Sequence, residues 1–145
     1  MRISMKSDYA LWAAMELAAS YGGRPLQTSE IAARRGIPES FLEQLLPSLR
    51  RAGIVASNRG PQGGHSLAIH PYRVTAGDVI RAVEGPMAVM DCVEASDRCR
   101  RSSSCVLKGV WGEVRSAIES VLDRVTIGEL AARQSAEDGT TMYYI

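Results

Sequence analysis

Residues 37–69 read IPESFLEQLLPSLRRAGIVASNRGPQGGHSLAI, and this stretch decides the fold. Its first part carries apolar side chains at helical spacing, with Phe41 at the edge of their face: Leu42, Leu45, Leu46 and Leu49. Pro38 suits the first turn of a helix, where its missing N–H costs nothing. Pro47 lies inside the pattern and removes one backbone donor, so we expect a kink or a local break between Glu43 and Pro47. The spacing predicts an amphipathic helix whose leucines face inward.

The second part of the stretch predicts a β-hairpin. Two short apolar segments, residues 54–57 and 66–69, flank residues 58–65. The intervening residues are rich in glycine and include a proline, which suits a tight, exposed tip.

Two helices are predicted upstream of this stretch. Apolar residues at helical spacing, with Ser7 ahead of them as an N-cap, predict the first: Leu11, Ala14, Met15, Ala18 and Ala19, with Leu17 widening the face along the line of Ala10 and Ala14. After a turn at residues 22–25, Thr28 is expected to cap a short helix over residues 30–35, which Gly36 ends in a left-handed conformation. Three helices followed by a hairpin with a basic, glycine-rich tip is the order of a winged helix-turn-helix.

The chain downstream of the hairpin is expected to begin with a helix. Thr75 and Asp78 approximate a capping box for a helix that runs to about Glu84. Residues 87–104 have no steady apolar period, and we expect a loop there.

A long helix is predicted from about Cys105 to Arg124, because apolar residues recur there mostly at steps of three and four. A helix of roughly 20 residues is about 30 Å long and overhangs a domain of this size. Its apolar stripe would be exposed in a monomer, so we expect a two-fold partner helix and a homodimer. Thr126 and Glu129 predict a second capping box for a short terminal helix, and Ser135 opens a polar tail.

Composition is consistent with this mainly α fold with a small β-hairpin. The chain has 145 residues, 46% of them hydrophobic and 23% charged, which suits one compact domain with a helical arm and excludes large barrels and wholesale disorder. No apolar run approaches the roughly 20 residues of a spanning helix, and no signal peptide is recognised, so we expect a cytoplasmic protein. The expected parts are a winged helix-turn-helix, a cysteine-bearing loop, a dimerisation helix with a short terminal helix, and a tail: residues 1–86, 87–105, 106–134 and 135–145.

The predicted third helix carries side chains suited to reading DNA bases. Ser40, Glu43 and Gln44 share a face turned away from the leucines, within the first two turns. Gln can bond adenine twice, Glu can accept from cytosine, Ser serves either, and the Phe41 ring could touch a thymine methyl. Through Arg73 nine Lys or Arg face five Asp or Glu, a balance of +4, whereas the remainder has a balance of −3. The alternative is a plain exposed polar helix face on an ordinary solvated surface.

The hairpin tip offers Arg59, Gln62 and His65 on a backbone kept slim by glycines. Such a tip suits the minor groove, and its place directly after the third helix favours that function. The alternative is an ordinary glycine-rich turn.

The three cysteines, Cys92, Cys99 and Cys105, fall in one segment with the spacing C-x6-C-x5-C. Three thiolates there suit an iron–sulfur cluster, and zinc less well because paired C-x2-C units are absent. Free or redox-active thiols are the alternative, and a thiol-redox or electron-transfer protein is a further one. No catalytic motif emerges, so we do not expect an enzyme.

The sequence resembles the Rrf2-type bacterial transcription regulators over nearly its whole length. The segments that carry the resemblance are Met1–Ser4 with Lys6 and Tyr9–Leu11, Phe41–Leu45, Gly53–Val55, Arg59–Gly64, Thr75–Ile80, Glu84–Pro86 and Thr126–Leu130. The resemblance implies a dimeric winged-helix repressor or activator, with the long helix as its dimerisation arm. It also implies major-groove reading by Ser40, Phe41, Glu43 and Gln44, and a minor-groove contact by Arg59.

The family has branches that differ in what they sense, including the IscR, NsrR and CymR branches. Resemblance to the cluster-binding branches implies that Cys92, Cys99 and Cys105 hold an iron–sulfur cluster of the two-iron or four-iron type. The IscR branch adds a histidine after the last cysteine, where this chain offers only Lys108. A nitric-oxide-sensing branch uses an aspartate from the first helix of the other subunit, which matches Asp8. An Asp in a first helical turn also simply complements the helix dipole.

The last residues resemble the CymR branch, which regulates cysteine metabolism and lacks the three cysteines. The ending Tyr143, Tyr144, Ile145 is similar to its aromatic-aromatic-Ile end. A terminal isoleucine carboxylate is the feature by which partners occupy the active site of O-acetylserine sulfhydrylase, so the resemblance implies a second sensing route through that enzyme. The alternative is a disordered end or a strand against the partner subunit.

Overall fold

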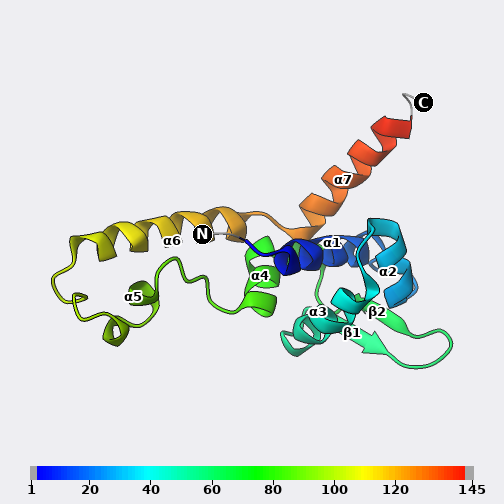
Figure 1. The fold of residues 1–145 in the computed structure, drawn as a ribbon. Coiled ribbons are helices and arrows are strands. Elements are labelled where there is room, and N and C mark those ends of the chain that lie inside the picture. Colours follow the sequence, from blue (N-terminus) through cyan, green and yellow to red (C-terminus); the bar gives the residue numbers. More distant parts are fainter. Residues whose placement is uncertain (1–2, 143–145) are drawn as a thin grey trace.

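A computed structural model describes residues 3–142 of the chain, with side chains described for residues 3–139. Figure 1 shows a helical head with a hairpin at its edge, a long helix leaving the head on one side, and a terminal helix leaving it on another. The elements, in chain order, are α1 (Met5–Ala19), α2 (Thr28–Arg35), α3 (Glu39–Arg51), β1 (Val55–Asn58), β2 (Gly64–Leu67), α4 (Ala76–Glu84), α5 (Asp91–Glu94), α6 (Val106–Arg124) and α7 (Ile127–Met142), with 3-10 turns at Pro71–Arg73 and Ser96–Arg98.

Helix α1 is the centre of the head, and it packs against α2, α3, α4, α7 and β2. Its most buried positions are mainly alanines, which let neighbouring helices approach closely: Ala10, Ala13, Ala14 and Leu17. The predicted amphipathic face was too narrow, because α1 is covered on several sides rather than on one. The core around it combines residues from every element of the head, including Ile31, Leu42, Leu49, Val79 and Ile127.

The start of α1 lies closer to the chain terminus than the sequence predicts. Ser4, not Ser7, is the N-cap, and its hydroxyl accepts from the Ser7 N–H at 3.3 Å. Ser7 is instead buried, and its hydroxyl donates to Glu84 Oε1 at 2.9 Å. Hydrogen bonds from Ser4 and Ser7 hold the pKa of Glu84 below its usual range. The first turn of α1 is therefore fixed to the end of α4.

Helices α2 and α3 form the helix-turn-helix. Gly36 ends α2 at φ +63°, as the sequence predicts. The expected break in α3 is absent, because the helix continues through Pro47 with all four of its leucines buried. Pro47 has no N–H to donate to the Glu43 carbonyl, four residues earlier. Glu43 is exposed, so water can donate to that carbonyl instead.

The hairpin pairs β1 with β2 in antiparallel register, from Val55 opposite Leu67 to Asn58 opposite Gly64. Strand β2 begins two residues earlier than the sequence predicts, so His65 lies in the strand and not in the tip. Strand β2 begins earlier because the backbone segment around Leu26 lies beside its first residues and pairs with them. Leu26 N–H donates to the His65 carbonyl at 2.9 Å, and His65 N–H donates back to the Leu26 carbonyl at 2.7 Å.

Both predicted capping boxes downstream are present. Thr75 and Asp78 cap α4, with the Thr75 N–H donating to Asp78 Oδ2 at 3.0 Å, and Thr126 and Glu129 bond in the same way at 2.9 Å. Helix α7 continues through Met142, past the point where the sequence analysis places a tail. A hydrogen bond from Gln134 to Asp138 at 2.8 Å, four residues apart, supports this extension.

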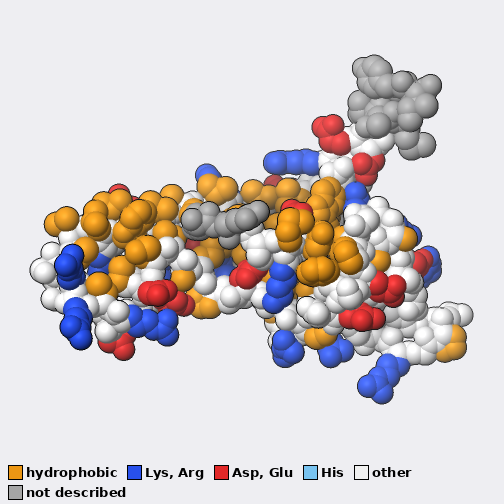
Figure 2. Space-filling model, viewed as in Figure 1, with side chains coloured by type: hydrophobic (Ala, Val, Ile, Leu, Met, Phe, Trp, Pro, Cys, Tyr) orange, Lys and Arg blue, Asp and Glu red, His pale blue; other side chains and the backbone are white. Residues whose placement is uncertain are grey.

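Helix α6, here called the arm, carries the exposed apolar stripe that the sequence predicts. None of its residues is buried, and Val106 is 86% exposed, with Leu107, Val110 and Val121 each more than half exposed. Figure 2 shows hydrophobic side chains gathered along the arm. Arg81 of α4 joins the root of the arm to the head through Asp123 at 2.7 Å. No helix in the described residues is long and apolar enough to cross a membrane.

Candidate nucleic-acid interface and cysteine loop

Four side chains at the start of α3 form what we call the recognition surface: Ser40, Phe41, Glu43 and Gln44. All four are exposed, on the side of α3 opposite its buried leucines. Among the described residues, the side chains of Ser40, Glu43 and Gln44 have no hydrogen-bond or ion-pair partner. Polar groups presented in this way are available to donate to and accept from the edges of bases.

The ring of Phe41 is supported from α1. It meets Tyr9 edge to face, with 5.4 Å between ring centroids and an interplanar angle of 70°. Phe41 nevertheless remains 42% exposed, so part of the ring is free for an apolar contact such as a thymine methyl. Sequence analysis did not single out Tyr9 as a support, because nothing in the local pattern indicates a contact between residues this far apart.

The second part of the candidate interface is the wing tip, residues 59–62 of the hairpin. Arg59 and Gln62 are exposed there, and Arg59 has no acidic partner among the described residues. Gly60 has φ +109°, a conformation that favours glycine and turns the tip tightly. Figure 2 shows Lys and Arg side chains along the lower edge of the head, the side on which Figure 1 places α3 and the hairpin. A basic edge of this kind suits the phosphates of a duplex.

His65 lies apart from the other proposed wing residues. Its ring is half-buried, with Nε2 3.0 Å from Thr28 Oγ1 and Nδ1 2.8 Å from Ser57 Oγ. Burial, and to a lesser degree the positive charge of Arg50, lowers the pKa of His65 below 6.5. Both ring nitrogens are thus engaged within the protein, which differs from the expectation that His65 faces DNA. Thr28, predicted as the cap of α2, is instead its first residue; Gln27 is the N-cap, and its N–H donates to Glu30 at 2.8 Å.

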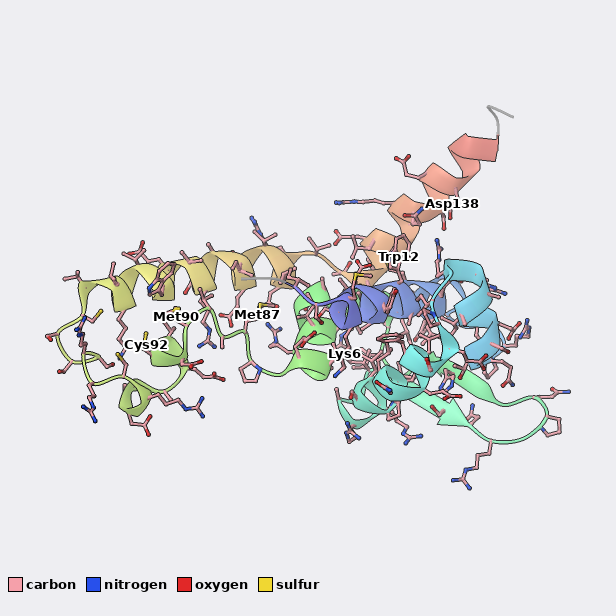
Figure 3. All side chains as sticks on the ribbon, viewed as in Figure 1. Lys6, Trp12, Met87, Met90, Cys92 and Asp138 are labelled. Carbon is pink, nitrogen blue, oxygen red and sulfur yellow. The ribbon has the colours of Figure 1, made fainter. Side chains whose placement is uncertain are left out.

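The cysteine loop, residues 87–105, runs from the head beneath the arm to its far end and contains α5 and a 3-10 turn where the sequence predicts only a loop. Cys92 lies in α5, Cys99 follows the turn, and Cys105 precedes α6; all three are free and half-buried. Figure 3 labels Cys92 there, with Met87 and Met90 nearby in the chain. Within the described residues, no three His, Cys, Asp or Glu side chains are grouped so as to hold a metal ion. Thiols have the right chemistry for an iron–sulfur cluster, but one protomer alone does not gather them.

The two candidates for a fourth ligand have different surroundings. The ammonium of Lys108 donates to Ser102 Oγ at 2.8 Å, and a protonated amine has no lone pair to offer a metal. Asp8 is exposed in the first turn of α1, beside a groove between α1 and α7 that Leu11 and Leu130 also line. Figures 1 and 3 show α5, which contains Cys92, beneath the outer part of the arm and away from α1, whereas residues 87–89 at the start of the loop line a pocket with Ser4 and Ser7. Among the described residues of one protomer, Asp8 and the cysteines form no group that could hold a metal ion. The tail residues Tyr143, Tyr144 and Ile145 lie outside the described residues.

Known proteins resemble this chain over its full extent. A family profile described as Rrf2, iron-dependent transcriptional regulator, matches residues 3–133. The chain is 37% identical to the HTH-type transcriptional regulator CymR of Bacillus subtilis over 145 residues, which is 100% of both chains. The solved structure of CymR, described as the global cysteine regulator of B. subtilis, matches with a TM-score of 0.75 at 36% identity, over 92% of this chain and 98% of that one. The structure of T. potens IscR also has a TM-score of 0.75 at 36% identity, over 99% and 97% of the two chains.

Proposed function

This chain belongs to the Rrf2 family of transcriptional regulators, a non-enzymatic class, and on that premise we propose that it is a homodimeric, sequence-specific DNA-binding regulator. The observation that carries the proposal is the recognition surface: exposed polar side chains without internal partners, beside a basic wing tip. In the proposed complex Gln44 bonds adenine, Glu43 accepts from cytosine and Phe41 touches a thymine methyl. Ser40 adds a further base contact, while Arg59 and Gln62 enter the minor groove.

The arm supplies the dimer interface in this proposal. An apolar stripe more than half exposed at Leu107, Val110 and Val121 is stabilised when a second copy covers it. Two-fold symmetry then presents two recognition surfaces, so the operator should be nearly palindromic, with half-sites about one helical turn apart or a multiple of it.

Binding-site selection from random duplexes, followed by fluorescence anisotropy, tests DNA recognition. The full-length protein is expected to enrich a near-palindrome and to bind it with a steep loss of affinity as salt rises, because Lys and Arg contacts release counterions. Preference over a scrambled duplex of the same length separates a regulator from a merely basic protein. Failure to enrich any sequence would contradict the proposal.

We propose further that Cys92, Cys99 and Cys105 hold an iron–sulfur cluster of the two-iron or four-iron type. Three half-buried thiols in one loop, and the description of the family as iron-dependent, support this assignment. Asp8 of the partner subunit is the proposed fourth ligand, since among the described residues Asp8 forms no metal-binding group with the cysteines of its own protomer. When bound, the cluster would supply an iron centre that responds to redox state or nitric oxide. The loop leads directly into the arm, so a change in the loop is placed to alter the spacing of the recognition surfaces, with a coupling of about 1–3 kcal/mol.

Anaerobic purification with an absorbance spectrum and iron and sulfide analysis tests the cluster. Iron and sulfide are expected in the wild type and should be lost in Cys99→Ala, while Ser103→Ala, an exposed change in the same loop, should retain both. Asp8→Ala is expected to weaken retention of the cluster. A colourless, iron-free wild-type preparation would contradict the assignment.

A second sensing route is supported by the match to CymR over the whole of both chains. In this candidate function, O-acetylserine sulfhydrylase binds the tail Tyr143, Tyr144, Ile145 and acts as the corepressor. Calorimetric titration of the enzyme with the full-length regulator is expected to show binding that is lost when residues 143–145 are deleted. Equal binding of both forms would exclude the tail as the docking element.

A further inference from the structure

The hairpin is docked onto the first helix of the helix-turn-helix by a set of contacts at its base. His65 of β2 lies between two hydroxyls, Thr28 at the start of α2 and Ser57 of β1, at 3.0 and 2.8 Å. Beside the ring, the backbones of Leu26 and His65 exchange two hydrogen bonds, and the Gln27 side-chain amide donates to the Gly63 carbonyl. One imidazole thus joins the two strands of the hairpin to α2, whose Thr28 is 37 residues away in sequence.

The backbone is packed closely at this junction. A Cβ built at Gly64 would lie 2.6 Å from the Leu26 carbonyl oxygen, and one at Gly63 would lie 2.2 Å from the Asn58 carbonyl oxygen. Glycine at position 64 therefore lets β2 approach the segment before α2, and glycine at position 63 lets the turn fold back onto the end of β1. The base of the hairpin is therefore held in one place, whereas Arg59 and Gln62 at the tip are exposed.

A hairpin of this size depends on such anchoring. Each strand has four residues, and an isolated two-stranded hairpin is marginally stable in water. The direction in which the tip projects is consequently set by contacts at its base rather than by the two strands alone. Among these contacts, the His65 ring is the side chain that bonds both α2 and β1.

We propose that His65 is a positioning residue for the wing tip: it fixes β2 against α2 and so determines where Arg59 meets DNA. The inference rests on the proposed DNA-binding function and assigns His65 a function other than touching a base. A neutral imidazole has one donor and one acceptor, and hydroxyl groups can supply the complementary partner to each. The ring therefore joins α2 to β1 while both of its nitrogens are hydrogen-bonded.

A double-mutant cycle with Arg59 tests this inference. His65→Phe keeps an aromatic ring of similar size and removes both hydrogen bonds. On the operator selected by the wild type, His65→Phe is expected to weaken binding about 10-fold and to reduce the salt slope by about one, as is expected of Arg59→Ala, which removes the charge that Arg59 brings to the minor groove. In the Arg59→Ala background, His65→Phe should cost less than about 2-fold, because the tip no longer has the contact to position.

Two further variants serve as controls and alternatives. Ser57→Ala removes one of the two hydrogen bonds with little change in volume, and it is expected to give a smaller loss that also disappears in the Arg59→Ala background. His70→Phe makes the same substitution at an exposed histidine beside Tyr21 and Tyr72, and it should leave DNA binding unchanged.

Three outcomes would overturn the inference. The first is that His65→Phe binds the operator with wild-type affinity. The second is that His65→Phe loses the same affinity in the wild-type and Arg59→Ala backgrounds. The third is that the salt slope of His65→Phe equals that of the wild type. Absence of any selected operator for the wild type would instead remove the proposed function itself, so the two failures are distinguishable.

Discussion

Glu43 is the residue of the recognition surface whose charge needs an explanation, because phosphates repel a carboxylate. An exposed carboxylate without an internal partner is useful there only if it accepts from a base such as cytosine. Glu43→Ala is therefore expected to relax specificity at one base pair in each half-site by about 1–3 kcal/mol, while the other positions keep their preference. A panel of operators with single substitutions measures this by anisotropy.

The control for that panel is Glu113→Ala, which removes an exposed carboxylate from the arm. It should leave the ranking of operators as in the wild type. If Glu43→Ala also leaves the ranking unchanged, Glu43 does not read a base.

His65 should make stability depend on pH in a defined direction. Burial and the charge of Arg50 lower its pKa in the folded protein below 6.5, so on acidification the unfolded chain takes up a proton before the folded one does. The free energy of unfolding contributed by His65 is therefore constant above pH 6.5 and falls as pH decreases through that value. Urea denaturation between pH 8 and about pH 5 should show a decline in the wild type that is reduced in His65→Phe. A decline of the same slope in both proteins would show that the ring is not held neutral by the fold.

The sequence predicted the structural roles of some residues and missed those of others. Gly36 and the capping pair of Thr75 and Asp78 were predicted correctly, because caps depend on residues within one turn. The partners of His65 and the support of Phe41 by Tyr9 were not predicted. Those contacts join residues on different elements, and no local periodicity encodes them.

At the scale of elements, a buried carboxylate joins α1 to α2. Glu16 is 5% exposed and pairs with Arg35, while Arg34 lies 3.4 Å from its other oxygen. The Arg35 guanidinium also lies over the Trp12 ring at 4.8 Å and 3.8 Å from Asp138 of α7. This one side chain therefore contacts α1 and α7 from α2; Figure 3 labels Trp12 of α1 and Asp138 of α7.

Arg35→Met should lower the free energy of unfolding by about 2 kcal/mol. Breaking a buried ion pair costs about 3–5 kcal/mol because a charge is left unpaired, and the nearby Arg34 reduces that loss. The matched control is Arg24→Met, which breaks an exposed pair with Glu30 at 2.6 Å and should change stability little. Urea denaturation of both variants measures the difference, and similar losses in the two would contradict the assignment.

The sequence predicted which helices and strands form in the head more accurately than where each one begins and ends. The order of helices and hairpin was correct, because each apolar period is local and matches a buried face. The start of β2 was placed too late, since its first residues pair with Leu26 and not only with β1. The length of α7 was underestimated because Gln134 and Asp138 stabilise turns that look like a polar tail.

For the whole molecule, the exposed arm predicts that the chain does not exist as a stable monomer at working concentration. Val110→Glu places a charge in the centre of the apolar stripe and should shift the protein towards monomer, since burying an unpaired charge is costly. Light scattering after size exclusion measures the molar mass. Ser116→Glu adds the same charge at an exposed polar position of the arm and should remain dimeric. A monomeric wild type, or a fully dimeric Val110→Glu, would contradict the proposed interface.

The cysteine loop could be assigned chemistry from the sequence but not geometry. The spacing of its three cysteines predicts a shared centre, yet within one protomer the described side chains do not form a metal-binding group. The proposed ligand from a second copy, Asp8, is suggested by the family resemblance and not by any local pattern, because no spacing within one chain encodes a contact between two copies.

The stoichiometry and symmetry of the DNA complex test the central proposal most directly. Native mass spectrometry of the full-length protein on its selected duplex, with a hydroxyl-radical footprint of the same complex, measures both. Two chains are expected on each duplex, with protection related by a dyad over two half-sites. One chain per duplex, or protection that is the same on a scrambled sequence, would contradict it.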